Sequence, residues 1–141
     1  MDEESQEMDE ATQDTDETTP AEKEEYVDFE MLREKVGKFV RERDWEKYHN
    51  PKDIAVAISV EAGELLELFQ WMNESEGKKI RENDKLMEQI KSELADVINH
   101  CVSMANALDI DLGKTILWKI RENEKKYPKE RYRGVWKKGT E

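Results

Sequence analysis

The chain is poor in several residue types that define protein classes. Its 141 residues include one cysteine, three prolines and six glycines, and aromatic residues make up 8% of the sequence. The single cysteine, Cys101, cannot form a disulfide within the chain, which argues against a disulfide-stabilised secreted fold and fits a reducing compartment. The few glycines form no phosphate-binding loop. No alternation of apolar and polar residues indicates a β-strand.

Long apolar runs are missing as well. No stretch approaches the roughly 18 consecutive apolar residues of a membrane-spanning helix, so we expect no membrane partner. The first residues are acidic, which fits neither a secretory signal nor an arginine-rich transit peptide. We therefore expect a cytoplasmic protein.

The negative charge is concentrated at the N-terminus. Residues 1–28 contain thirteen acidic residues and one lysine, whereas residues 29–141 contain twenty-two acidic and twenty-two basic residues, so the first segment carries the whole net charge of −12. A segment with so few apolar residues cannot bury enough surface to offset its ordering entropy. We predict a disordered acidic tail over residues 1–27. The neutral remainder gives no electrostatic reason to expect nucleic acid as a partner.

Apolar residues recur at helical spacing through most of the chain. They predict four helices, which run from the N-cap Asp28 to about 45, from Pro51 to about 72, from about 82 to 108, and from about 111 to 126. The pair Tyr127-Pro128 ends the last helix. Together the helices predict an all-α fold, a four-helix bundle. We assign residues 28–130 to one folded domain and residues 131–141 to a basic C-terminal extension.

Two of the predicted helices carry acidic residues where apolar ones are expected. Glu61 and Glu64 lie in or beside the apolar stripe of the second helix, and Glu93 and Asp96 border the stripe of the third. Four carboxylates on neighbouring helices would repel one another and would be costly to bury as ions. A hard divalent cation removes both costs, and oxygen-only ligands favour Mg²⁺ or Mn²⁺.

The same carboxylates can also be explained without a metal. They can be solvated, or paired with Lys85, Lys91 or Arg121, and the common spacing Glu-x-x-Glu does not choose between these readings. A di-iron site is disfavoured, because such bundles use a Glu-x-x-His pair on each of two helices and neither pair here supplies that histidine.

In their order along the chain, these motifs resemble the all-α NTP pyrophosphatases of the MazG-like superfamily, and most of all its dCTP pyrophosphatase branch. The superfamily's ExxE and ExxD motifs match Glu61–Glu64 and Glu93–Asp96. The stretches "RDW", "ELFQW", "ELADVI" and "KYP" extend the resemblance over about residues 28–130.

The resemblance implies an enzyme of nucleotide pool clean-up that acts on dCTP or modified dCTP. The four acidic residues would bind Mg²⁺ and serve catalysis, and water would attack the α-phosphate to give the monophosphate and pyrophosphate. The residues implied to contact the substrate are Trp45, His49, Trp71, His100, Lys119 and Asn123. The resemblance also implies a homo-oligomer, a dimer or a tetramer.

Some readings stay open. The tryptophans can instead be core residues, and His49 and Lys119 can be surface residues. The dCTP pyrophosphatase branch has a tyrosine in place of His100 and a histidine in place of Val36, and both face the nucleotide. The alternatives are therefore another nucleotide such as dUTP, or a helical nucleotide-binding module without catalysis.

Overall fold

The computed structural model describes residues 26–135, and this part contains helices and turns without strands, which confirms the all-α prediction. The long helices are α1 (Phe29–Glu42), α2 (Pro51–Glu67), α4 (Asp84–Ala107) and α5 (Leu112–Lys126). Shorter elements are the 3₁₀ turn η1 (Glu46–Tyr48), α3 (Glu74–Lys78), the 3₁₀ turn η2 (Ile80–Glu82) and α6 (Lys129–Tyr132). Residues 1–25, which hold nearly all of the predicted acidic tail, lie outside the described part, as do residues 136–141.

Three of the helix starts follow from side chains that cap the first turn. Asp28, Asn50 and Asp111 each accept a hydrogen bond from the backbone N–H three residues further on, at 2.8, 3.0 and 3.0 Å. Such caps satisfy donors that the helix itself cannot. Pro51 occupies the first position of α2, where its missing N–H costs nothing. The starts predicted at these positions are confirmed.

The end of α2 differs from the prediction. The helix stops at Glu67 rather than near residue 72, because the Leu66 carbonyl accepts from the N–H groups of both Phe69 and Gln70, at 2.9 Å each, and the chain turns there. The polar segment that follows was expected to be a simple break. It contains α3 instead, since Asn73 and Glu76 form a reciprocal capping box with bonds of 3.0 and 2.9 Å.

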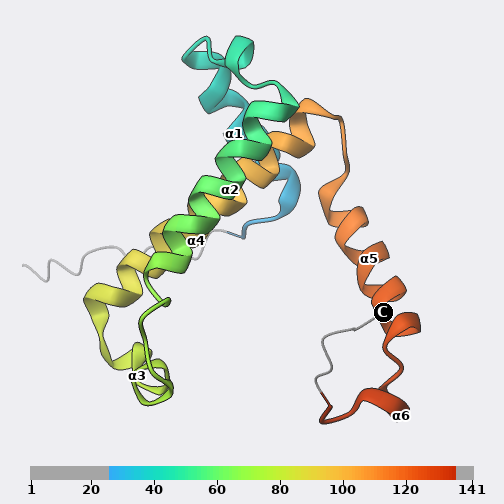
Figure 1. Ribbon diagram of the computed structural model, residues 1–141. Helices are drawn as coiled ribbons and strands as arrows, with labels where there is room; N and C mark the ends of the chain where they lie inside the picture. Colours follow the sequence, from blue (N-terminus) through green and yellow to red (C-terminus); the bar gives the residue numbers. More distant parts are fainter. Residues whose placement is uncertain (1–25, 136–141) are drawn as a thin grey trace, which may run out of the picture.

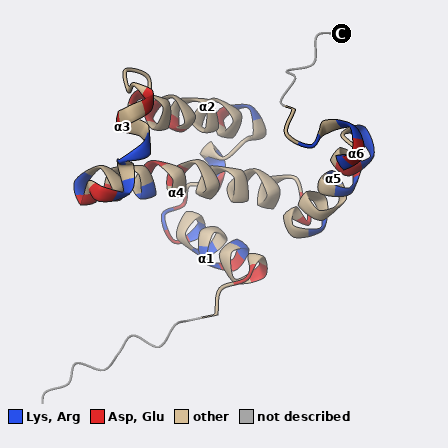
Figure 2. Ribbon diagram, turned by 90° about the horizontal axis from the view of Figure 1, so that it is seen from below, with Lys and Arg blue, Asp and Glu red and all other residues tan. Residues whose placement is uncertain are grey.

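Helices α2 and α4 lie side by side and antiparallel, and α1 packs against α4 (Figures 1 and 2). The core of the described part is small: Val40, Ile54, Val102 and Ala105 are its buried apolar residues. Helical spacing in the sequence predicts an apolar stripe on this helix made of Ile90, Leu94, Val97, Cys101, Met104 and Leu108. Val102 is outside that stripe yet only 1% exposed, whereas Leu94, on the stripe, is 49% exposed. The reason is that α4 contacts α1 as well as α2, so its buried surface is wider than one stripe.

A side-chain clamp joins α1 to α4. Arg33 donates from Nε to Oδ1 of Asn106 at 3.2 Å, and Asn106 donates from Nδ2 to the carbonyl oxygen of Arg33 at 3.1 Å. Both groups are partly buried and are 73 residues apart in the sequence. The clamp therefore fixes the position of α1 along α4.

Helix α5 stands apart from the α2–α4 pair (Figure 1). It begins beside α1, where a Cβ on Gly113 would be 3.6 Å from the ring of Phe29. Further along, Ile116, Leu117 and Ile120 are 40%, 56% and 49% exposed. Within residues 26–135, the fourth long helix thus keeps an uncovered apolar face. No helix of this part is long and apolar enough to cross a membrane.

Candidate metal site

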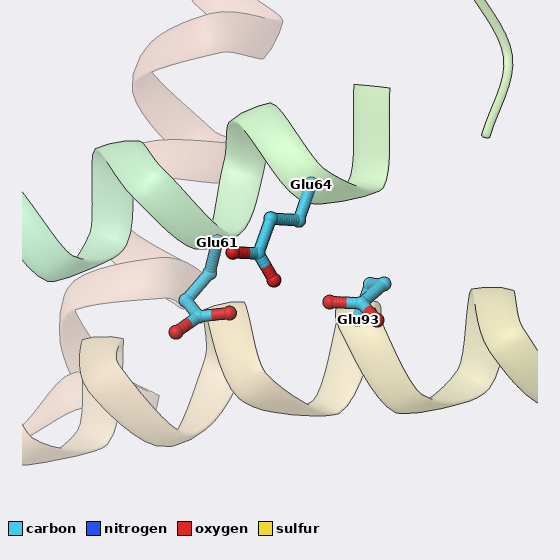
Figure 3. Close-up of side chains that lie close together, drawn as sticks. All are labelled: Glu61, Glu64 and Glu93. Carbon is cyan, nitrogen blue, oxygen red and sulfur yellow. The ribbon is translucent and has the colours of Figure 1, made fainter. Parts of the chain in front are cut away.

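Three glutamates converge between α2 and α4. Glu61 and Glu64, on successive turns of α2, point toward α4, and Glu93 of α4 points back toward them (Figure 3). One carboxylate oxygen from each lies within 4.8 Å of the others. The antiparallel packing of α2 on α4 brings residues about 30 positions apart to this spot. The separation suits a single cation shared by carboxylate oxygens.

Asp96, the fourth predicted ligand, lies one turn beyond Glu93 on α4 and is partly buried. It does not belong to the trio of converging oxygens, but its charge acts on Glu93. Partial desolvation raises the pKa of Glu93 above the usual 4.5, and the charges of Glu64, Asp96 and Glu61 and a hydrogen bond with Glu64 act in the same direction. The carboxylates therefore repel one another, and a bound cation would relieve this repulsion.

The basic side chains considered from the sequence do not neutralise the cluster. Lys91 pairs with Glu88 at 2.6 Å, and in the described part neither Lys85 nor Arg121 forms an ion pair with these glutamates. The group beside the cluster is His100, whose Nε2 is 3.5 Å from Oε1 of Glu61. His100, predicted to contact substrate, is thus adjacent to the candidate metal ligands.

The two tryptophans predicted to contact the substrate lie far apart. Trp45 precedes α2 and Trp71 follows it, and a helix of 17 residues is about 25 Å long. Neither is a core residue: Trp45 is 44% exposed and meets Phe39 edge-on at 5.8 Å between ring centroids, and Trp71 is 87% exposed. The described part of one chain therefore does not place both rings on one base.

The predicted residues of α5 are also separate from the carboxylates. Lys119 is exposed, with its Nζ 6.0 Å from the ring centroid of Trp118. Asn123 is exposed, and its backbone carbonyl accepts from the N–H of Tyr127 at 2.8 Å. Because α5 does not pack along α2 or α4, the structure does not bring these two side chains to the cluster.

A cleft of about 500 Å³ lies between α1 and the C-terminal half of α4. His49 is the one predicted substrate residue among its described lining residues, and its Nδ1 is 2.9 Å from the Trp45 carbonyl oxygen. Val36, which the resemblance placed toward the nucleotide, lines the same cleft. Ser103 and Asn106 of α4 line it as well, and neither was predicted from the sequence.

The chain is similar to several known proteins. A family model described as the MazG-like family matches residues 56–141. The protein named dCTP pyrophosphatase 1 from Rattus norvegicus is 34% identical over 105 residues, which are 74% of this chain and 62% of that protein. The protein of the same name from Homo sapiens is 37% identical over 116 residues, 79% of this chain and 66% of that protein. The chain thus spans less than two thirds of the length of these relatives.

A solved structure is similar as well. The crystal structure of a pyrophosphatase from Archaeoglobus fulgidus has a TM-score of 0.62 and 32% sequence identity, and the match covers 74% of this chain and 95% of that one. The family model matches more than half of the chain and includes both pairs of acidic residues, whereas Trp45 and His49 precede it. The chain therefore belongs to the MazG-like family.

Proposed function

We propose that this protein is a Mg²⁺-dependent nucleoside triphosphate pyrophosphatase. It hydrolyses dCTP or a modified dCTP to the monophosphate and pyrophosphate, and so removes unwanted nucleotides from the pool. The observation that carries the proposal is the convergence of Glu61, Glu64 and Glu93 within 4.8 Å in a chain of the MazG-like family. The relatives named dCTP pyrophosphatase 1 support the choice of base.

The residues present fit a divalent cation. The donors are carboxylate oxygens, the ligands that Mg²⁺ and Mn²⁺ prefer, and desolvation together with their repulsion raises the pKa of Glu93. Glu61, Glu64, Glu93 and Asp96 would hold the ion. When bound, it supplies Lewis acidity to the triphosphate and to a water molecule. The donor set therefore supports this cofactor.

The chain's own residues would bind and orient the substrate and accept a proton. A glutamate oxygen not engaged by the cation can accept a proton from the attacking water, since the three glutamates face one small space. His100, whose Nε2 is 3.5 Å from Oε1 of Glu61, would orient that carboxylate when the imidazole is protonated. Pyrophosphate is the leaving group. Lys119 and Asn123 would contact its oxygens if α5 of a second copy of the chain reaches the site.

The separation of α5 from the carboxylates also supports a homo-oligomer, a dimer or a tetramer. The face formed by Ile116, Leu117 and Ile120 is 40–56% exposed, and the apolar core of the described part is small. Packing this face against a second copy would bury it and could deliver Lys119 to a neighbouring site. Light scattering should report two or four copies, and a monomer at assay concentration would contradict this part of the proposal. The free thiol Cys101 supports a cytoplasmic location.

The function is tested by pyrophosphate release from canonical and modified dNTPs and NTPs, with Mg²⁺, with Mn²⁺ or with a chelator. We expect metal-dependent release, greatest for cytosine nucleotides. Glu64→Gln and Asp96→Asn should each lower kcat/KM more than 100-fold, because loss of residues that only support metal ligands already costs about 10–100-fold. Glu67→Gln, one turn further on α2 and outside the trio, is the matched control.

Other outcomes identify the alternatives. Release from uracil or purine nucleotides alone would name another substrate for the same chemistry. A folded protein that binds nucleotides but releases no pyrophosphate would be a binding module. Wild-type activity in Glu64→Gln, with circular dichroism unchanged, would refute the metal-site assignment.

A further inference from the structure

A basic surface covers the last turn of α5 and the short helix α6. Residues 125–133 contain five basic residues and one acidic residue, a net charge of +4. The blue of lysine and arginine gathers around α6 in Figure 2. Residues 76–88, by comparison, contain four basic and four acidic residues, a net charge of zero. The excess of positive charge is therefore a local feature of this end of the described chain.

Most cations of the basic surface have no anionic neighbour. Lys125 pairs with Glu122 at 2.7 Å between Nζ and Oε1. Among residues 26–135, the other four cations are exposed and form no ion pair; they are Lys126, Lys129, Arg131 and Arg133. Like charges held this close together repel one another, so a polyanion at this surface would relieve the repulsion.

Two tyrosines shape the basic surface. The rings of Tyr127 and Tyr132 meet edge-on, with centroids 5.4 Å apart. Nζ of Lys126 is 5.4 Å from the centroid of the Tyr127 ring. The guanidinium of Arg131 is 5.9 Å from the centroid of the Tyr132 ring. A hollow of about 690 Å³ lies beside the two rings and is also lined by Lys129, Glu130 and Arg133. Ammonium, guanidinium and phenol groups all donate hydrogen bonds, so the hollow favours a segment rich in carboxylates.

The N-terminal segment of the same chain has the complementary charge. Residues 1–25 contain twelve acidic residues and one lysine, a net charge of −11, and lie outside the described part. Because the segment is attached to the chain, its effective concentration at the surface is on the order of millimolar, which favours it over a polyanion from solution. Attraction between charges needs no apolar core, so it is compatible with the composition of this segment.

The attachment point of the segment lies within reach of the basic surface. Phe29 begins α1, four residues after the segment ends, and a Cβ on Gly113 at the start of α5 would be 3.6 Å from its ring. The 15 residues of α5 span about 22 Å from there to the basic surface. Twenty-five extended residues span up to about 80 Å. The acidic segment can therefore follow α5 to its far end with residues to spare.

We propose that the acidic segment of residues 1–25 docks on the basic surface of its own chain. Its carboxylates pair with the four cations that lack a partner, and the tyrosine hydroxyl groups donate to further carboxylates. The docked segment neutralises the surface and keeps other polyanions away from it. The inference is independent of the proposed function, because it uses none of the candidate metal ligands.

The test is carbodiimide cross-linking of the full chain, which joins a carboxylate to a lysine amine that it touches, followed by peptide mapping with mass spectrometry. At about 20 mM salt, cross-links from residues 1–25 to Lys126 and Lys129 should outnumber those to Lys79 and Lys85 by about tenfold, since an excess of four charges favours the basic surface by about a factor of two per charge. At about 0.5 M salt this preference should disappear, because the screening length falls to about 4 Å.

Two double variants locate the docking surface. Arg131→Glu with Arg133→Glu keeps every lysine and changes four units of charge, so it should lower the yield of cross-links to Lys126 and Lys129 about tenfold. Lys79→Glu with Arg81→Glu makes the same change of charge in the neutral stretch of residues 76–88 and is the matched control. Its yield at Lys126 and Lys129 should stay within about twofold of wild type. Circular dichroism checks that both variants fold, and the wild-type map with its salt dependence tests the inference without either variant.

Three results would overturn the inference. The first is a set of cross-links spread evenly over the lysines, or an equal loss in the two double variants. The second is cross-links that join normal to heavy-isotope chains in the proportion of their mixture, which would place the segment on another copy. The third is an absence of cross-links from residues 1–25 together with fluorescence anisotropy showing that a single-stranded oligonucleotide binds the wild type but not the double arginine variant. The surface would then belong to a polyanion from solution. A failure to release pyrophosphate would overturn the proposed function alone.

Discussion

The clamp between α1 and α4 gives a stability prediction that follows from its two hydrogen bonds. Asn106→Ala removes the acceptor of Arg33 Nε, at 3.2 Å, and the donor to the Arg33 carbonyl, at 3.1 Å. Each partly buried bond contributes a net of about 1 kcal/mol, so the variant should lose about 2 kcal/mol of unfolding free energy. The remaining partners of Arg33 do not compensate, because Glu30 and Asp109 are 69% and 99% exposed.

Urea denaturation followed by circular dichroism measures this loss, at one protein concentration because assembly would add to apparent stability. With a slope of about 2 kcal/mol/M, the midpoint should fall by about 1 M. Arg33→Ala and the double variant complete a cycle, and the coupling between the two side chains should be about 1 kcal/mol. A midpoint for Asn106→Ala within error of wild type would show that the clamp does not hold α1 on α4.

Two further predictions concern α4 and its carboxylates. Asn83→Ala removes the side chain that accepts from the N–H of Leu86 at 3.0 Å, so it should lower the unfolding free energy by about 1 kcal/mol. Asn83→Asp keeps a carboxylate acceptor and should retain most of that free energy. Equal losses of the two variants in urea denaturation would contradict the role of Asn83 as a helix cap. The pKa of Glu93 is raised above 4.5 in the folded chain, so the folded chain binds the proton of this carboxyl more tightly than the unfolded chain does. The free energy of unfolding without metal should therefore fall as pH rises from 4.5 through the folded pKa of Glu93. Glu93→Gln should therefore raise the metal-free Tm at pH 7, flatten its dependence on pH above 4.5, and abolish the rise in Tm with Mg²⁺; a lower metal-free Tm would refute the repulsion argument.

The helix starts could be predicted because their causes are local. Asp28, Asn50 and Asp111 form caps with groups three residues away, so a few letters of sequence decide them. The convergence of the glutamates could be anticipated in part, since spacings of three place side chains on one helix face. The side chains converge only because a second helix lies against that face, which follows from the packing of α2 on α4.

The features that could not be predicted from the sequence depend on contacts between distant segments. Val102 is buried because α4 has α1 as a second neighbour, and a single helical stripe cannot show this. The separation of Trp45 from Trp71 follows from where α2 begins and ends. The cleft beside Ser103 depends on the pairing of Arg33 with Asn106 across 73 residues. The capping box that begins α3 is local, and the spacing of Asn73 and Glu76 was enough to predict it.

The isolation of α5 has a consequence for amide hydrogen exchange. Within residues 26–135, α5 meets the rest of the chain chiefly at its start, beside Phe29. A helix of 15 residues with so little packing is marginally stable in water, since its hydrogen bonds alone barely offset the ordering of its backbone. The amides of α5 should therefore exchange with solvent through local opening, while those around Val102 on α4 should exchange only when the chain unfolds. Amides of one chain should thus exchange at two different rates. The amides of α5 can become as slow as those of α4 only when another surface covers the apolar face of α5.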